Sequence, residues 1–394
     1  MRLAPIFSLL ALAGAFAACS GKGPSGFGDA GFGEDGGLGG PDACGFACID
    51  GGTLGDGGGG CNPDPGNFDV PGNGCDDDGD GTVDNPQGSC DASLQLGGPA
   101  GDFAKAIGLC KVSTNGSWGV VSATYTNGYN STKAPADPNQ HGILKKFGNK
   151  ITPRQGSAFG VLSSGWATEY DQCDDPQGVF KGGCQMGDGV TTNTPPPGYP
   201  KKVGQCDPST DIYDAMGVTL KIKVPNNAKG FAFDFDFWSG EWPEWVCSTF
   251  NDSFVAWLQS AAFSGNGGDF NVSFDANKNP INVNNAFFQS CSPANATVGC
   301  IEGPGNLTDA CKNGDSELQG TGFYDPGGQN CGDDDSGGGS TSWLTTQAPV
   351  QPGETITLQF IIWDTGDGVY DSSVIIDNWQ WQASDTSVTT HPVN

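Results

Sequence analysis

The chain has 394 residues and a formal net charge of −28 at pH 7, because 45 acidic residues face only 17 basic ones. Nucleic-acid binding depends on Lys and Arg side chains that neutralise phosphates, so this charge argues against a nucleic-acid partner and against simple adhesion to anionic lipid. An acidic surface outside the cell suits divalent cations, although the same charge also keeps an exported protein soluble.

The N-terminus has the order of a secretory signal. Arg2 is followed by an apolar run over residues 6–16 and by small residues that end at Cys19. We therefore expect residues 1–18 to be a signal peptide that is removed. Cys19 is then acylated and holds the protein by lipid at the outer membrane or cell surface. The alternative is cleavage after Ala17, which frees the protein. No later apolar stretch reaches the ~20 residues of a spanning helix, so lipid is the expected membrane attachment.

The cysteine content indicates export. Fifteen cysteines are an odd number, and setting Cys19 aside leaves fourteen, enough for seven disulfides in an oxidising compartment. The absence of any C-x-x-C pair argues against a zinc site. Sequence does not fix the pairing, but two short loops, Cys75 to Cys90 and Cys291 to Cys300, are candidates for local closure.

Composition divides the rest of the chain. Residues 19–61 are mostly Gly, Asp, Pro and Ala with little to bury, so they are expected to form a flexible tether. Residues 62–97 form an Asp-rich segment with flanking cysteines. The composition becomes globular over residues 98–385, and residues 386–394 are expected to be a tail.

The Asp-rich segment contains a candidate calcium loop. Its carboxylates and hydroxyl alternate with small residues, as in the D-x-D-x-D-G start of a calcium loop, at Asp76, Asp78, Asp80, Thr82 and Asp84. Pro86 and Gln87 stand where an EF-hand has its helix and bidentate Glu, so the loop looks more like the disulfide-flanked aspartate loops of extracellular calcium repeats. We predict weak calcium binding, with a dissociation constant of roughly 10⁻⁴ to 10⁻³ M. The alternative is an acidic linker.

The globular part predicts one short helix and many strands. Asp102 is a candidate N-cap for the helix, and Gly108 lies near its end. Apolar residues alternate along the strand-like stretches 218–224, 231–237 and 355–363, and residues 374–381 supply a last apolar strand. Many short strands and scarcely any helix predict a mainly β protein, an antiparallel β-sandwich, with a jelly-roll barrel as the alternative.

The residue pattern of one of these strands predicts an apolar face and an acidic face. Residues 231–237 place four phenylalanines on one face and Asp234 and Asp236 on the other. We expect the phenylalanine face to be buried and the aspartate face to be solvated.

Two acidic groups follow apolar strands. The first contains Glu241, Glu244, Asn251 and Asp252, and the second contains Asp364, Asp367 and Asp371. The stretches 231–254, 337–346 and 364–381, rich in Trp, Asp and Gly, resemble the choice-of-anchor L domain family of secreted or surface proteins of Gram-negative bacteria.

The resemblance covers most of residues 98–385. It implies a β-sandwich-like surface domain whose biochemical role is largely undefined. Family members usually carry two acids where this chain has Gly240-Glu241, so the role of the first acid of that pair is not carried over to this chain. By position we predict one divalent-cation or loop-bracing site from Glu244, Asn251, Asp252, Asp364, Asp367 and Asp371. The alternative is that these side chains accept backbone hydrogen bonds and fix turns without metal.

Catalysis is the weaker hypothesis. A Ser-His-Asp site would rest on His141 alone, because His391 lies in the expected tail, and no catalytic residues are predicted. Three tryptophans, Trp238, Trp242 and Trp245, either stack on sugar rings or belong to the core.

We predict a non-enzymatic, calcium-stabilised surface module that acts in adhesion, envelope interaction or contact with a surface glycan or protein ligand. An extracellular carbohydrate-active hydrolase, which needs only two carboxylates, is the alternative from another class. A structural envelope component is the third hypothesis.

Overall fold

A computed structural model describes residues 61–85, 89–167, 192–284, 287–294, 297–301, 303, 311–324 and 338–393. The expected signal peptide, the lipidation site Cys19 and the expected tether up to residue 60 lie outside the described residues. None of the helices in the described part is long and apolar enough to cross a membrane.

Two antiparallel sheets form the fold, as predicted for a β-sandwich, and neither closes into a barrel. The first sheet has the order β1-β5-β12-β7-β8, with β4 paired to β5. Its strands are β1 (Gly119–Thr126), β4 (Thr192–Asn193), β5 (Ile212–Lys223), β7 (Ser253–Gln259), β8 (Ile281–Asn282) and β12 (Thr355–Thr365).

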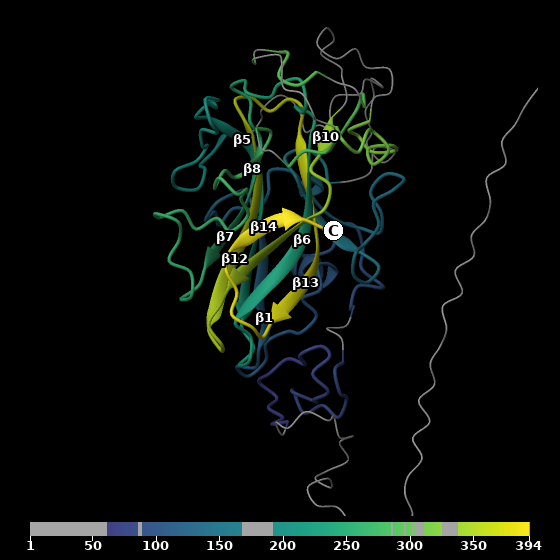
Figure 1. The fold of residues 1–394 in the computed structure, drawn as a ribbon, viewed down its shortest axis with the longest axis vertical. Helices are drawn as coiled ribbons and strands as arrows, with labels where there is room; N and C mark the ends of the chain where they lie inside the picture. The colour runs from purple at the N-terminus through teal and green to yellow at the C-terminus, as the bar shows by residue number, and fades with distance from the viewer. Residues whose placement is uncertain are drawn as a thin grey trace, which may run out of the picture. The chain divides into compact units, whose positions relative to one another are not determined.

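The second sheet has the order β14-β11-β6-β13-β3-β2, and β10 joins β6 to β9. Figure 1 labels β6, β10, β13 and β14 of this sheet. Residues 386–394, expected to be a tail, thus supply the edge strand that pairs with β11. The strands are β2 (His141–Leu144), β3 (Phe159–Ser163), β6 (Gly230–Ser239), β9 (Ser290–Cys291), β10 (Gly339–Ser340), β11 (Leu344–Pro349), β13 (Ser372–Gln382) and β14 (Thr389–Pro392).

The main core lies between the sheets. The four phenylalanines of β6 point into it, as the alternation predicted, and Phe233 packs edge-on against Phe360 of the opposing sheet with ring centroids 4.9 Å apart. Period-2 alternation places every second side chain on this face, which is why the apolar stretches of the sequence became the long strands.

The expectation that Asp234 and Asp236 face solvent is wrong. Both are buried, because loops that follow β2 and precede β10 cover the outer face of the second sheet and build a smaller apolar cluster around Trp238 and Phe323. Asp234 accepts hydrogen bonds from Arg154 Nε and Thr345 Oγ1, each at 2.5 Å. Burial raises the pKa of Asp236 well above its usual range.

The predicted helix forms, but its cap differs. Helix α1 (Ala100–Ala106) has Pro99 at the N-cap position and no side-chain cap, so Asp102 is not the cap. Asp102 lies in the first turn and pairs with Lys105 Nζ at 2.8 Å. A 3₁₀ turn, η1 (Pro138–Gln140), follows β1 and carries a complete capping box from Asp137 and Gln140.

The local disulfide pairings suggested by loop length are wrong. Cys75 bonds to Cys61, Cys90 bonds to Cys110, and Cys291 bonds to Cys311, while Cys300 is also disulfide-bonded. A fourth bridge of the described part joins Cys206 to Cys247. The oxidised bridges agree with the export inferred from the cysteine count.

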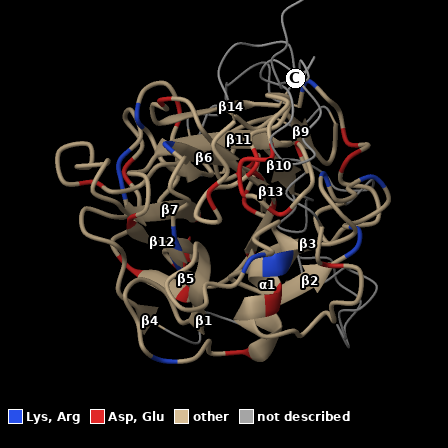
Figure 2. Ribbon diagram, turned by 90° about the horizontal axis from the view of Figure 1, so that it is seen from below, with Lys and Arg blue, Asp and Glu red and all other residues tan. Residues whose placement is uncertain are grey.

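The Asp-rich segment packs on the sandwich. Phe68 is buried in the main core, and the side-chain amide of Asn227 bonds both its N–H and its carbonyl, at 3.0 and 2.8 Å. Residues 61–85, purple in Figure 1, lie at one end of the long strands. Figure 2 marks the acidic and basic residues along the ribbon, and the whole chain has 45 acidic and 17 basic residues.

Candidate cation sites

Four acidic side chains are buried where strands of both sheets end. Glu241 follows β6, and Asp371 precedes β13, which is the neighbour of β6 in the second sheet. Asp252 precedes β7, and Asp364 lies at the end of β12, which pairs with β7 in the first sheet. The two acidic groups of the sequence are therefore brought together across the sandwich. We call Glu241, Asp252, Asp364 and Asp371 the buried acid cluster.

Asp252 connects the two sheets through its carboxylate. Its Oδ1 accepts a 3.0 Å bond from the backbone N–H of Thr365 in β12, and its Oδ2 accepts a 2.6 Å bond from the Ser372 hydroxyl in β13. Its own backbone N–H donates to Glu241 Oε2 at 3.3 Å. Asp252 is fully buried, so these bonds are formed away from water.

Asp364 is the least satisfied member of the cluster. Its side chain is 1% exposed, and neither carboxylate oxygen has a hydrogen-bond partner of ordinary geometry in the described part of the chain. It faces the carboxyl group of Asp252, and electrostatic repulsion by Asp371 also raises its pKa. An ionised carboxylate only accepts hydrogen bonds, so Asp252 and Asp364 attract one another only when a proton or a cation lies between them.

Burial raises the pKa of three of the acids in this cluster. Desolvation is the largest cause for Glu241, Asp252 and Asp364, and repulsion by neighbouring carboxylates adds to it. The pKa of Asp252 rises to about 7, and those of Glu241 and Asp364 rise well above their usual range. Among the described residues, Glu241, Asp252 and Asp364 form no ion pair with a Lys or Arg side chain.

The other predicted ligands lie around the cluster. Asp367 is half-buried near Glu241 and Asp252, with Oδ1 accepting from the N–H of Val369 at 3.1 Å. Glu244 and Asn251 are buried in the loop between β6 and β7. Asn251 Oδ1 accepts a bond from the backbone N–H of Asn284, so it braces that loop.

At neutral pH the carboxylates of this cluster are either protonated or bound to a cation. Buried ionised carboxylates cost several kcal/mol each without compensation, so they take up protons or hold a cation. An oxygen-only donor set suits a hard cation such as calcium. Glu241, which was not among the predicted ligands, belongs to the cluster. The Glu-x-x-Glu spacing after β6 was its only signal.

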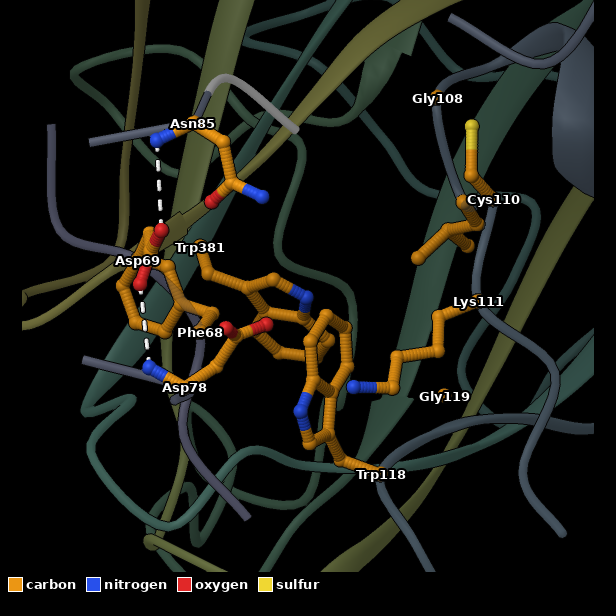
Figure 3. A pocket seen from close by; sticks show the side chains of 11 residues that line it. Phe68, Asp69, Asp78, Asn85, Gly108, Cys110, Lys111, Trp118, Gly119 and Trp381 are labelled. Atoms are coloured by element: carbon orange, nitrogen blue, oxygen red, sulfur yellow. Dashed lines mark hydrogen bonds between the residues drawn. The ribbon is translucent and has the colours of Figure 1, made fainter. Parts of the chain in front are cut away.

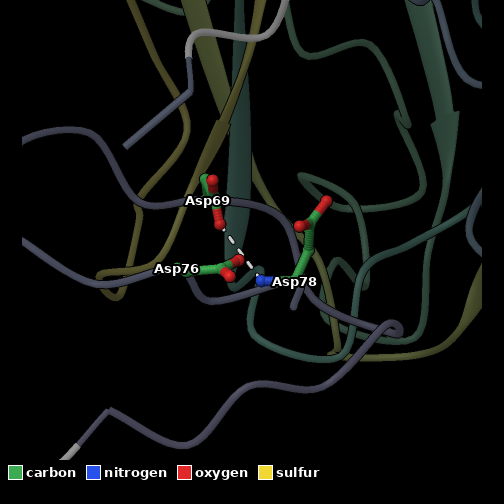
Figure 4. Close-up of side chains that lie close together, drawn as sticks. All are labelled: Asp69, Asp76 and Asp78. Carbon is green, nitrogen blue, oxygen red and sulfur yellow. Dashed lines mark hydrogen bonds between the residues drawn. The ribbon is translucent and has the colours of Figure 1, made fainter. Parts of the chain in front are cut away.

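A second acidic group lies in the Asp-rich segment. Asp69, Asp76 and Asp78 place carboxylate oxygens within 4.8 Å of one another. Figure 4 shows these three side chains close together. No other group of His, Cys, Asp or Glu in the described residues meets this spacing, and the buried acid cluster is more widely spaced. Asp69 was not predicted, because it precedes the alternating loop by seven residues.

Backbone N–H groups already surround this second group. Asp76 accepts bonds from the N–H groups of Gly79, Asp80 and Gly81, and Asp69 Oδ1 accepts from Asp77 and Asp78. Three predicted ligands, Asp80, Thr82 and Asp84, lie outside this group. Asp80 accepts a hydrogen bond from the backbone N–H of Thr82, and Asp84 accepts from the backbone N–H groups of Asn73 and Gly74. These bonds fix the turns of the Asp-rich segment, for which the predicted alternative to calcium was an acidic linker.

The tryptophans considered for sugar stacking are largely core residues. Trp238 and Trp242 are buried, and Trp245 is half-buried against Phe250. Trp242 stacks on Phe288 with centroids 4.2 Å apart. The interpretation of Trp238 and Trp242 as core is therefore confirmed.

His141 stacks on a neighbouring ring. Its ring lies 3.6 Å from that of Tyr125 and nearly parallel to it, and burial lowers its pKa to about 4. No hydrogen bond among the described residues joins it to a serine or a carboxylate.

The comparisons with known proteins place this fold in a family. The comparison with curated proteins and the comparison with solved structures found no match. A model of the choice-of-anchor L domain matches residues 210–380, from the start of β5 to the end of β13, and this range contains the buried acid cluster. The match indicates an exported bacterial surface protein. Residues 210–380 belong to the choice-of-anchor L domain family.

Proposed function

We propose that the protein is a lipid-anchored binding module of the bacterial surface, whose sandwich is stabilised by calcium in the buried acid cluster. The observation that carries the proposal is the burial of Asp252 and Asp364 face to face at the junction of the two sheets. A divalent cation between them removes the repulsion and joins β12 to β13 through one set of ligands.

Extracellular conditions support this assignment. Calcium is abundant outside the cell, and extracellular modules bind it with dissociation constants of roughly 10⁻⁴ to 10⁻³ M. A sandwich that needs calcium at one end is stable after export, and its loops are then rigid enough to contact a partner. Adhesion, envelope interaction and glycan contact are the functions that such a module serves without chemistry.

Anchoring by acylated Cys19 complements the module. The Gly- and Asp-rich residues 19–61 carry little to bury, so they separate the sandwich from the membrane by a tether. A partner in the surrounding medium or on another cell then reaches the sandwich.

Thermal unfolding of the full chain with disulfides intact tests the calcium site. Melting is compared in EDTA and in millimolar calcium for the wild type, for Asp364→Asn and for the triple variant Asp76→Asn, Asp78→Asn, Asp80→Asn. Ligand at about 100 times its dissociation constant adds about 2.7 kcal/mol, which raises the melting temperature of a domain this large by several degrees.

The matched variants distinguish the two acidic groups. We expect the wild type and the triple variant to shift with calcium and Asp364→Asn not to shift. Loss of the shift in the triple variant alone would assign calcium to the Asp-rich segment. An unchanged melting temperature in all three proteins would overturn the calcium proposal.

Incubation with bacterial and plant polysaccharides tests the binding role. Retention of the protein without turnover supports binding. Release of shortened sugars would favour the hydrolase. If the protein is not retained and no sugars are released, the structural role is favoured.

A further inference from the structure

A cavity lies between the Asp-rich segment and the sandwich, at the far end of β13 from the buried acid cluster. Its walls include three aromatic side chains, Phe68, Trp118 and Trp381 (Figure 3). The cavity has a volume of about 170 Å³. Asp371 and Trp381 stand ten residues apart along an extended chain, so the cavity and the cluster are roughly 30 Å apart. All the lining residues lie outside the range matched by the family model, 210–380.

Opposite charges share this cavity. The Lys111 ammonium lies 4.1 Å from the centre of the Trp118 ring, and the carboxylate of Asp78 also lines the wall. Asp78 Oδ1 accepts a 3.0 Å bond from the N–H of Asp80, which holds that carboxylate in place. In Figure 3 both charged side chains extend toward the tryptophans.

The local backbone fixes these groups before any ligand arrives. Gly119 has φ of +126°, and a Cβ there would lie 2.4 Å from the carbonyl oxygen of Lys111. Only glycine at position 119 therefore allows the backbone to approach that of Lys111 so closely, and this approach places the side chains of Lys111 and Trp118 face to face. On the opposite wall, Asp69 binds the N–H groups of Asp78 and Asn85. The disulfide from Cys90 to Cys110 joins the same two parts of the chain.

The cavity retains unused bonding capacity. The indole N–H of Trp118 is shielded from solvent and has no hydrogen-bond partner in the described part of the chain. A buried polar group without a partner costs about 1–3 kcal/mol, which a ligand with an acceptor oxygen recovers.

We propose that this cavity binds one neutral pyranose ring of a glycan. The CH face of a sugar packs on indole rings, and its hydroxyls both donate to a carboxylate and accept from an ammonium or indole N–H. A ligand with a single charge is attracted by one of Lys111 and Asp78 and repelled by the other, so the cavity favours neither sign of charge. The volume is below the roughly 300–1,000 Å³ of pockets for drug-sized ligands, so it suits a single sugar ring.

The inference rests on the binding function proposed above and names its ligand class. The two are separable, because calcium stabilisation is assigned to the other end of the sandwich.

Saturation-transfer NMR and tryptophan fluorescence with the full chain test the cavity. The probes are the methyl glycosides of glucose, galactose, mannose, N-acetylglucosamine and N-acetylgalactosamine, with glucuronic acid as a charged probe. We expect at least one neutral glycoside to bind and glucuronic acid not to bind.

Two variants of the cavity and one matched control locate the binding. Trp118→Leu is expected to weaken affinity by about tenfold, the equivalent of one aromatic contact. Lys111→Met, which keeps the apolar stem, removes a hydrogen-bond donor and also weakens binding. Trp343→Leu is the control, because Trp343 is another half-buried tryptophan beneath a cation, with the Arg154 guanidinium carbon 5.7 Å from its ring centre. It is expected to bind like the wild type.

Several results would overturn the inference. They are the absence of binding by every neutral glycoside, preferential binding of glucuronic acid, and loss of binding in Trp343→Leu with retention in Trp118→Leu. Circular dichroism and the calcium shift report whether each variant is folded. If Trp118→Leu does not fold, the affinity of Lys111→Met tests the inference instead. A calcium shift that persists without sugar binding would overturn the cavity assignment alone and leave the proposed calcium-stabilised module intact.

Discussion

Asp252 and Ser372 form a 2.6 Å hydrogen bond that joins the two sheets of the sandwich at one end. The bond is charge-assisted whenever Asp252 is ionised, and such bonds are about twice as strong as neutral ones. Both residues are buried and stand next to strands that are far apart in the sequence, so the bond fixes how the sheets meet.

Replacement of Ser372 by Ala should destabilise the fold. The Asp252 carboxylate loses a donor while it remains buried, which costs about 1–3 kcal/mol. Urea unfolding at pH 7 measures the change. Ser373→Ala is the control, because the Ser373 hydroxyl bonds only to the neutral Ser163 hydroxyl, at 2.9 Å. An equal loss in both variants would contradict the special role of the carboxylate.

The pH dependence of stability in EDTA should report the buried acids. The folded pKa of Asp252, about 7, lies above its ordinary 3.8, so the folded state binds a proton that the unfolded state has released. The stability contribution is therefore full below pH 4 and is lost as the pH rises through 7. Calcium should reduce this loss, because it stabilises the ionised form.

Urea unfolding between pH 4 and 8 measures this effect as the difference between the wild type and Asp252→Asn. The comparison cancels His141, whose pKa is lowered to about 4 and which therefore acts in the opposite direction. We expect the stability of the wild type to decline more steeply toward pH 8. Parallel curves for the two proteins would show that Asp252 does not titrate in this range.

The Cys206–Cys247 disulfide should support the acid cluster. It spans 41 residues and holds the loop that contains Glu241 and Glu244. Removing it by a double Cys→Ala change should cost about 4 kcal/mol by loop entropy and reduce the calcium shift. The Cys61–Cys75 bridge spans 14 residues, and its removal should cost about 3 kcal/mol and leave the shift unchanged. Equal calcium shifts in both variants would show that the loop held by the Cys206–Cys247 disulfide does not contribute to calcium binding.

Substitution of Cys19 should release the protein from membranes. Cys19→Ser removes the thiol that we propose carries the lipid, so the protein should move from the detergent phase to the aqueous phase in a partition assay. Cys44→Ser, which also removes one cysteine but lies within the tether, should leave it in the detergent phase. Aqueous partitioning of the wild type would favour cleavage after Ala17.

Local patterns determined the architecture. Alternation over residues 231–237 and 355–363 predicted β6 and β12 because a strand has a fixed period of two, whatever lies around it. The tryptophan and aspartate stretches pointed to the choice-of-anchor L family, which residues 210–380 confirm. Both acidic groups were also visible as loop sequences, and their order relative to the strands placed them at strand ends.

Tertiary structure alone decided what those residues face. Asp234 and Asp236 are buried because distant loops cover the outer sheet face, and alternation within one strand carries no information about such a cover. The disulfide partners, the inclusion of Glu241 beside Asp252, and the meeting of Asp78, Lys111 and Trp381 in one cavity likewise depend on chain segments far apart in sequence. Propensity acts over a few neighbouring residues, whereas burial, desolvation and pKa depend on everything packed within a few ångströms.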